Sequence, residues 1–121
     1  MDYKKAERNT QLINELFVED LQRSLAFYTA IGFTIERSDD HFAVLSWENS
    51  LLFLDQQNIE NRPAHAGMNI RIIVHDVDKY WEMALSAGYP VFQVIDNKYY
   101  GLRDFTILDP DGFGVRFGTY I

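Results

Sequence analysis

Few residues in this chain could carry out nucleophilic or metal chemistry. The sequence has 121 residues and no cysteine, which excludes disulfides, thiol nucleophiles and thiolate metal sites. Its three histidines are far apart: His41 stands beside a turn, His65 in a polar segment, and His75 just before a helix cap. We therefore expect surface or capping histidines, because a metal site needs such side chains to converge.

The charge and composition narrow the range of partners. The formal net charge of −7 repels the phosphates of DNA and RNA, so we expect no nucleic-acid partner. An acidic surface suits a cationic small molecule, but it also keeps proteins soluble, and the charge alone does not decide between these interpretations. Aromatic residues make up 15% of the chain, which leaves rings available for a ligand cavity or a subunit interface.

Nothing in the sequence directs the protein to a membrane. No apolar run approaches the roughly 18 residues that a membrane span needs. Residues 1–9 are charged and polar, unlike a signal peptide. We expect a cytoplasmic protein with no membrane partner.

The hydrophobic pattern predicts the same series of elements twice, namely one strand, one helix and three strands. Each helix follows an aspartate that can cap it and ends at a glycine, at Asp20 and Gly32 in the first half and at Asp76 and Gly88 in the second. A polar segment with Pro and Gly, residues 56–67, links the halves. The predicted strands cover residues 12–18, 33–37, 42–47, 51–55, 69–74, 91–95, 103–108 and 114–117.

The two halves match when the sequence is shifted by 56 residues without a gap. The capping aspartates align, as do the terminal glycines, and an aromatic residue follows each glycine. Such caps are generic and could converge, but the identical helix length favours duplication. We expect an α+β protein of two tandem βαβββ modules, with module one at about 11–55 and module two at about 68–118.

Two segments carry a resemblance to a known family. Residues 17–33 (FVEDLQRSLAFYTAIGF) and 100–117 (YGLRDFTILDPDGFGVRF) resemble the first helix and the closing hairpin of the vicinal oxygen chelate superfamily. That superfamily includes glyoxalase I, extradiol dioxygenases and bleomycin-resistance proteins. The resemblance covers roughly residues 12–118 and implies a single domain, here 1–121, in which paired modules form a curved mixed sheet, often assembled as a homodimer.

The resemblance also implies where a metal would bind. Metal-using members place His, Glu or Gln on the first and last strand of each module, and those four positions fall here at Ile13, about Phe53, Asn69 and Arg116. Two apolar groups, one amide and one cation cannot chelate a divalent ion. We therefore expect no metal and no cofactor, as in the metal-free bleomycin-resistance branch.

The same alignment and the alternation of side chains along strands place Glu15, Phe17, Phe53, Asp55, Arg71 and Arg116 in a ligand-binding cup. Phe42 and Trp47 add rings from a neighbouring strand, and the resemblance to bleomycin-binding relatives implies that Tyr99 and Tyr100, in the loop before the closing hairpin, help to form the groove. Aromatic rings would stack on a planar ligand, carboxylates would meet cationic groups, and guanidinium groups would meet acidic or carbonyl groups. The alternatives are plain core packing for each ring and ion pairs among the charged residues. The predicted ligand-binding residues are Glu15, Phe17, Phe42, Trp47, Phe53, Asp55, Arg71, Tyr99, Tyr100 and Arg116.

These observations favour a metal-independent binding protein over an enzyme. Such a protein would sequester a planar or cationic small molecule, such as an antibiotic. The alternative is a lyase or isomerase of the same superfamily that uses Glu15 as a base, since an apolar cup can raise the pKa of a carboxyl group. A metal-dependent dioxygenase or glyoxalase would require ligands that the four positions do not supply.

Overall fold

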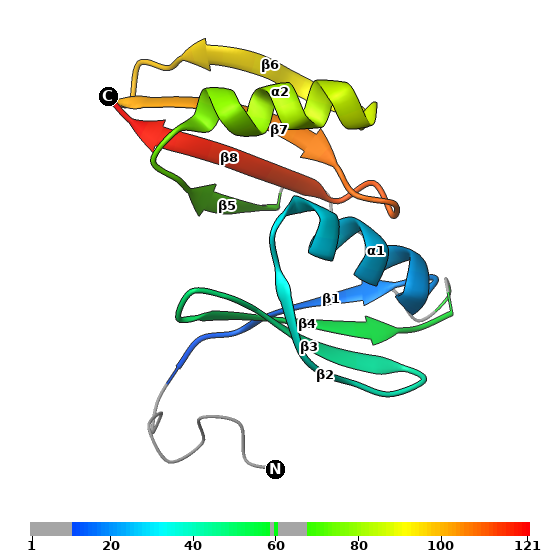
Figure 1. The fold of residues 1–121 in the computed structure, drawn as a ribbon. Helices are drawn as coiled ribbons and strands as arrows, with labels where there is room; N and C mark the ends of the chain where they lie inside the picture. The colour runs from blue at the N-terminus through cyan, green and yellow to red at the C-terminus, as the bar shows by residue number, and fades with distance from the viewer. Residues whose placement is uncertain (1–10, 59, 61–67) are drawn as a thin grey trace. The chain divides into compact units, whose positions relative to one another are not determined.

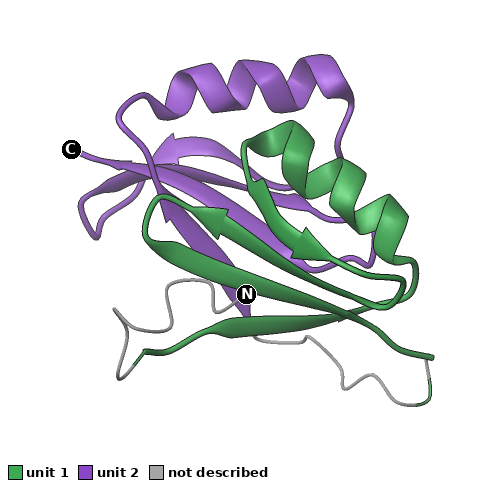
Figure 2. Cartoon of the chain, turned by 60° about the horizontal axis from the view of Figure 1, so that its bottom comes forward, with its two compact units in different colours: residues 1–63 green, residues 64–121 purple. Residues whose placement is uncertain are grey.

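The protein divides into two compact units, residues 1–63 and 64–121 (Figure 2). The structure is a computed structural model and describes residues 11–58, 60 and 68–121. Most of the predicted linker, with His65, lies outside the described residues. Each unit contains one strand, one helix and three strands in that order, so the predicted α+β fold of two tandem βαβββ modules is confirmed.

Unit one holds a four-stranded mixed sheet in the order β1-β4-β3-β2. Strand β1 runs parallel to β4, and the other neighbours are antiparallel. Helix α1 lies along one face of this sheet (Figure 1). The elements are β1 (Asn14–Val18), α1 (Leu21–Ile31), β2 (Thr34–Ser38), β3 (Phe42–Trp47) and β4 (Ser50–Gln56).

Unit two repeats this topology in a second four-stranded sheet, in the order β5-β8-β7-β6. Strand β5 is parallel to β8, as β1 is to β4. The helices have the same length, 11 residues, which confirms the equality that the sequence repeat predicted. The elements are β5 (Asn69–Ile73), α2 (Val77–Ala87), β6 (Val91–Asn97), β7 (Leu102–Leu108) and β8 (Gly114–Tyr120).

The two helices begin differently although both follow an aspartate. The Asp20 side chain accepts a hydrogen bond from the backbone N–H of Arg23, at 3.1 Å, as an N-cap should. Asp76 stands at the corresponding position, but its side chain makes no capping bond. Instead, the Thr119 hydroxyl accepts from the N–H of Val77 at 2.9 Å, so β8 supplies the cap of α2. The predicted start of α2 was therefore right, but the prediction that the Asp76 side chain caps it was wrong.

Each unit has its own apolar core between its helix and its sheet. In unit one, alternate residues of β1, β3 and β4 are buried against α1, including Val18, Leu45 and Leu54. In unit two, Trp81 of α2 packs edge-on against Phe105, with ring centroids 5.1 Å apart. The remaining residues of each strand point to the opposite side of the sheet, which we call the helix-free face of that unit.

Candidate ligand-binding site

The helix-free face of unit one brings together five predicted binding residues. In the parallel pairing of β1 with β4, Glu15 lies opposite Phe53 and Phe17 opposite Asp55. In the antiparallel pairing of β3 with β4, Phe42 also lies opposite Asp55. Residues paired in register share a face of the sheet. Three phenylalanines and two carboxylates therefore form one continuous surface.

Two of the rings on this surface contact each other, and its two carboxylates interact. The Phe42 and Phe53 rings meet edge to face, with centroids 5.3 Å apart. Burial, and then the charge and hydrogen bonding of neighbouring Asp55, raise the pKa of Glu15 above its usual value. Gln57 donates to the Asp55 carboxylate at 3.1 Å. Two adjacent carboxylates make this face a place where a cation would relieve repulsion.

Trp47 does not join this surface, contrary to the prediction. It lies on the other side of β3, toward α1, where its ring packs 5.3 Å from that of Phe33. The contact with the end of α1 is close: a Cβ at Gly32 would stand 2.7 Å from the Trp47 ring. Trp47 therefore stabilises the turn between α1 and β2 and belongs to the core of unit one.

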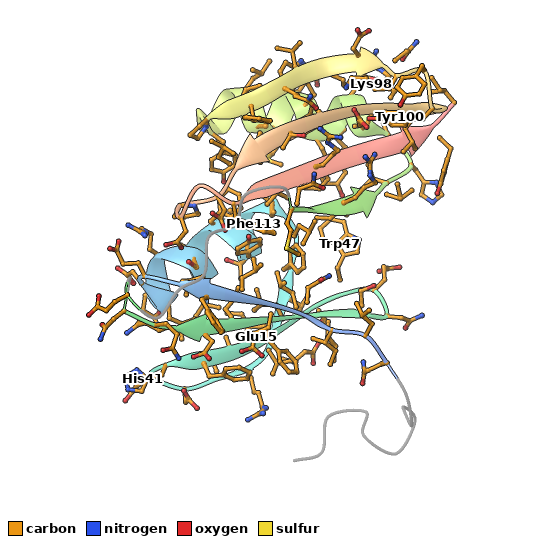
Figure 3. The ribbon with its side chains drawn as sticks, turned by 180° about the vertical axis from the view of Figure 1, so that it is seen from behind. Glu15, His41, Trp47, Lys98, Tyr100 and Phe113 are labelled. Carbon is orange, nitrogen blue, oxygen red and sulfur yellow. The ribbon has the colours of Figure 1, made fainter. Side chains whose placement is uncertain are left out.

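A cluster of four side chains on the helix-free face of unit two is centred on Asp104, whose side chain is fully buried. Its carboxylate accepts hydrogen bonds from Arg71 at 2.9 Å, Lys98 at 2.5 Å and the Tyr100 hydroxyl at 2.7 Å. Figure 3 shows Lys98 and Tyr100 close together where β6 turns back into β7. Burial alone would raise the pKa of Asp104, but the donors outweigh it and hold that pKa below its usual value.

Asp104 and Lys98 are the residues that sequence reasoning missed. Arg71 was predicted either to meet a ligand or to pair with another charged residue, and its carboxylate partner is Asp104. The tip of the Arg71 side chain also lies over the Tyr100 ring, 5.5 Å from its centroid. The available signal was an aspartate inside a predicted strand, between Arg103 and Phe105, because such an acid must find a cation when it is buried.

The two tyrosines of the β6–β7 loop have different surroundings. Tyr100 is tied to Asp104 through its hydroxyl, whereas Tyr99 is 99% exposed. Their rings contact edge to face, with centroids 5.2 Å apart. Neither ring is buried, so the loop is held by the polar contacts of Tyr100 and by backbone hydrogen bonds, such as that from Lys98 to Leu102 at 2.7 Å, and not by apolar anchoring.

Arg116 borders a cavity of about 390 Å³ in unit two. Its guanidinium donates to the Thr106 hydroxyl at 2.6 Å, to Gln93, and to the Tyr100 hydroxyl at a long 3.5 Å. All three partners are uncharged. The cavity is lined by Met68, Asn69, Phe92, Thr106, Leu108, Gly112, Gly114 and Arg116.

The positions implied for a metal do not fit a divalent ion in this structure. Arg116 is fixed by hydrogen bonds as a cation beside the cavity, and the Asn69 position offers one amide. Within residues 11–58, 60 and 68–121, no three His, Asp or Glu side chains are grouped so that they could hold a metal. His41 and His75 are exposed. A site of this composition would repel a metal ion.

No helix in the part of the chain that the structure describes is long and apolar enough to cross a membrane.

Comparisons with known proteins agree on the fold. The family model of the Glyoxalase/Bleomycin resistance protein/Dioxygenase superfamily matches residues 11–117. A glyoxalase/bleomycin resistance protein/dioxygenase from Alicyclobacillus acidocaldarius superposes with a TM-score of 0.75 at 18% identity, covering 93% of this chain and 92% of its own. The comparison with curated proteins finds no match to this sequence.

Two further solved structures similar to this chain have different activities. A bleomycin-binding protein in complex with bleomycin has a TM-score of 0.72 at 20% identity, covering 93% of this chain and 100% of its own. A lactoylglutathione lyase from Agrobacterium tumefaciens has a TM-score of 0.72 at 19% identity, and the match covers 92% of this chain and 93% of the lyase. At these identities the likeness establishes the fold, which both a binding protein and an enzyme share.

Proposed function

The chain belongs to the glyoxalase/bleomycin resistance protein/dioxygenase superfamily, and from that premise we propose that it is a metal-independent small-molecule binding protein. The helix-free face of unit one would hold a planar, cationic ligand and sequester it, as expected of an antibiotic-binding protein. The observation that carries this proposal is the joint surface of Phe17, Phe42 and Phe53 with Glu15 and Asp55.

The chemistry of this surface matches a flat cation. Aromatic rings stack on planar ligands and attract positive charge through their faces. The two carboxylates add direct attraction for a cation, and the net charge of −7 favours its approach. The bleomycin-binding protein among the structural neighbours supports an antibiotic as the kind of ligand to test first. A cytoplasmic location and a single domain over residues 1–121 complete the proposal.

Calorimetry with bleomycin, ethidium and phenanthridine tests this function. Ethidium and phenanthridine share a ring system, but only ethidium carries a permanent charge. We expect bleomycin and ethidium to bind more tightly than phenanthridine. Glu15→Gln should weaken the binding of ethidium but not that of phenanthridine. Phe53→Ala should weaken the binding of both ethidium and phenanthridine. Glu82→Gln, on exposed helix α2, is the matched control. Absence of binding by all three compounds would contradict the proposal, and so would equal affinity for ethidium and phenanthridine.

A lyase or isomerase is the second candidate, and the raised pKa of Glu15 is the observation that favours it. A carboxylate of higher pKa is a better base for abstracting a proton from carbon. The test is turnover of any substrate found by screening: Glu15→Gln should reduce kcat at least about a hundredfold. Full activity of that variant would remove this candidate and leave the binding function standing.

A further inference from the structure

We propose that the cavity of unit two is a second binding site, specific for a small apolar molecule that carries a carboxylate, with Arg116 as the carboxylate-binding residue. The site is independent of the function proposed above, because its lining residues all belong to unit two.

Charge balance on this face points to an anionic ligand. Arg71 and Lys98 both pair with the Asp104 carboxylate, at 2.9 and 2.5 Å. Arg116 has no acidic partner among the described residues, and its hydrogen bonds go to neutral oxygens. A half-buried guanidinium without a counter-charge is costly. A ligand carboxylate would supply the missing charge.

The hydrogen bonds of Arg116 leave donors available and fix their direction. A guanidinium has five N–H donors. Three are used, by Thr106, Gln93 and Tyr100, so two remain. The 2.6 Å bond from Nε to Thr106 holds the plane of the group, which reduces the entropic cost of binding. Two remaining donors match the two oxygens of one carboxylate.

The walls of the cavity indicate the rest of the ligand. Met68, Phe92 and Leu108 provide apolar surface, and Met68 and Phe92 remain largely exposed. Gly114 keeps a side chain out of a crowded part of the wall, because a Cβ there would stand 3.1 Å from the Asn69 Cβ and 3.4 Å from a Thr106 methyl. A volume of about 390 Å³ is at the small end of ligand pockets. An aryl or alkyl carboxylate fits this description better than a phosphate, which would leave the apolar walls uncovered.

Titration with 3-phenylpropionate, monitored by NMR chemical shifts, tests the proposal. Its amide, 3-phenylpropionamide, has the same shape without the charge, and acetate has the charge without the ring. We expect the acid to bind at least about tenfold more tightly than either. Equal binding of acid and amide would overturn the role assigned to Arg116, and equal binding of acetate would overturn the role of the apolar walls.

Variants of the cavity locate the site. Arg116→Gln should lose at least about tenfold in affinity for the acid and little for the amide. Phe92→Ala should weaken both, and it offers a variant with little risk to folding because Phe92 is 68% exposed. Arg103→Gln is the matched control, since Arg103 pairs with Asp78 on α2. Retention of full affinity by Arg116→Gln and Phe92→Ala, or no binding at about 10 mM acid, would refute the site.

Discussion

Asp104 shows how a single buried acid organises the face of a sheet. Its carboxylate joins β5, the β6–β7 loop and β7 through Arg71, Lys98 and Tyr100. Gly118, its partner in β8, has no side chain, and a Cβ there would lie 3.3 Å from the Asp104 Cβ and 3.9 Å from Arg71. The glycine therefore leaves Arg71 room to reach across β8.

Removal of this acid should destabilise the protein. We expect Asp104→Asn to lower the free energy of unfolding by about 2–3 kcal/mol, because it leaves two cations without their counter-charge. Since the pKa of Asp104 is lowered by folding, its contribution is present above about pH 4 and is lost as the pH falls through the folded-state pKa. Urea unfolding of both proteins at neutral and acid pH measures this. Asp78→Asn, at an exposed ion pair, should have a small effect.

Glu15 should have the opposite pH dependence. Its pKa is raised by folding, so the charged form costs stability above the folded-state pKa, and this cost disappears below the unfolded value of roughly 4.3. We expect Glu15→Gln to unfold at a higher temperature than the wild type at pH 7 and to lose that advantage near pH 4. Glu82→Gln should show no such trend. A Glu15→Gln variant that is less stable at pH 7 would contradict the repulsion from Asp55.

At the scale of elements, local sequence signals predicted where the helices begin and end, but they did not predict contacts between residues that are distant in the sequence. The limits of α1 and α2 were predictable because a capping position and a terminal glycine act on neighbouring residues. The place of Trp47 followed from alternation, because Phe42 and Trp47 are five positions apart on one strand and therefore point to opposite faces, so the sequence prediction that grouped them was wrong on local grounds. The role of Asp104 was not predictable, since it depends on which strands become neighbours.

The two helix-ending glycines provide a test of these local signals. Gly32 has φ +126° and lies against the Trp47 ring, whereas Gly88 has φ +75° and a methyl group added there would have no neighbour within 4 Å. We expect Gly32→Ala to cost about 2–3 kcal/mol from combined backbone strain and steric conflict, and Gly88→Ala about 1 kcal/mol from backbone strain alone. Thermal unfolding of both variants measures the difference. Equal losses would show that contact with Trp47 contributes nothing.

At the scale of the molecule, the two units share one backbone topology but differ in the side chains on their helix-free faces. Glu15 lies opposite Phe53 in β4, and Arg71 lies opposite Arg116 in β8, so these pairs occupy equivalent places. Glu15 and Arg71 are 56 residues apart, whereas Phe53 and Arg116 are 63 apart. Unit two therefore has seven more residues than unit one between its helix and its last strand. This is why the sequence repeat is clear through the helix and fades afterwards.

We also expect a homodimer, as the family resemblance implies. Edge strand β6 exposes Val91 and Val94, and such apolar edges favour association. Light scattering after size-exclusion chromatography should give twice the chain mass of 14.1 kDa. Val94→Lys should shift the protein toward the monomer, with Lys79→Glu on α2 as the control. A wild type that elutes as a monomer at high concentration would refute this expectation.

The equivalence of Glu15 and Arg71 has an evolutionary consequence. Each sheet is supported by its own helix and its own core, so exposed side chains on its helix-free face, unlike buried Asp104, can change without disturbing the residues that hold the fold. In a chain of two such units, the helix-free face of each unit can therefore acquire a new ligand separately. In this chain, one such face carries carboxylates and aromatic rings, and the other carries mainly guanidinium and ammonium groups.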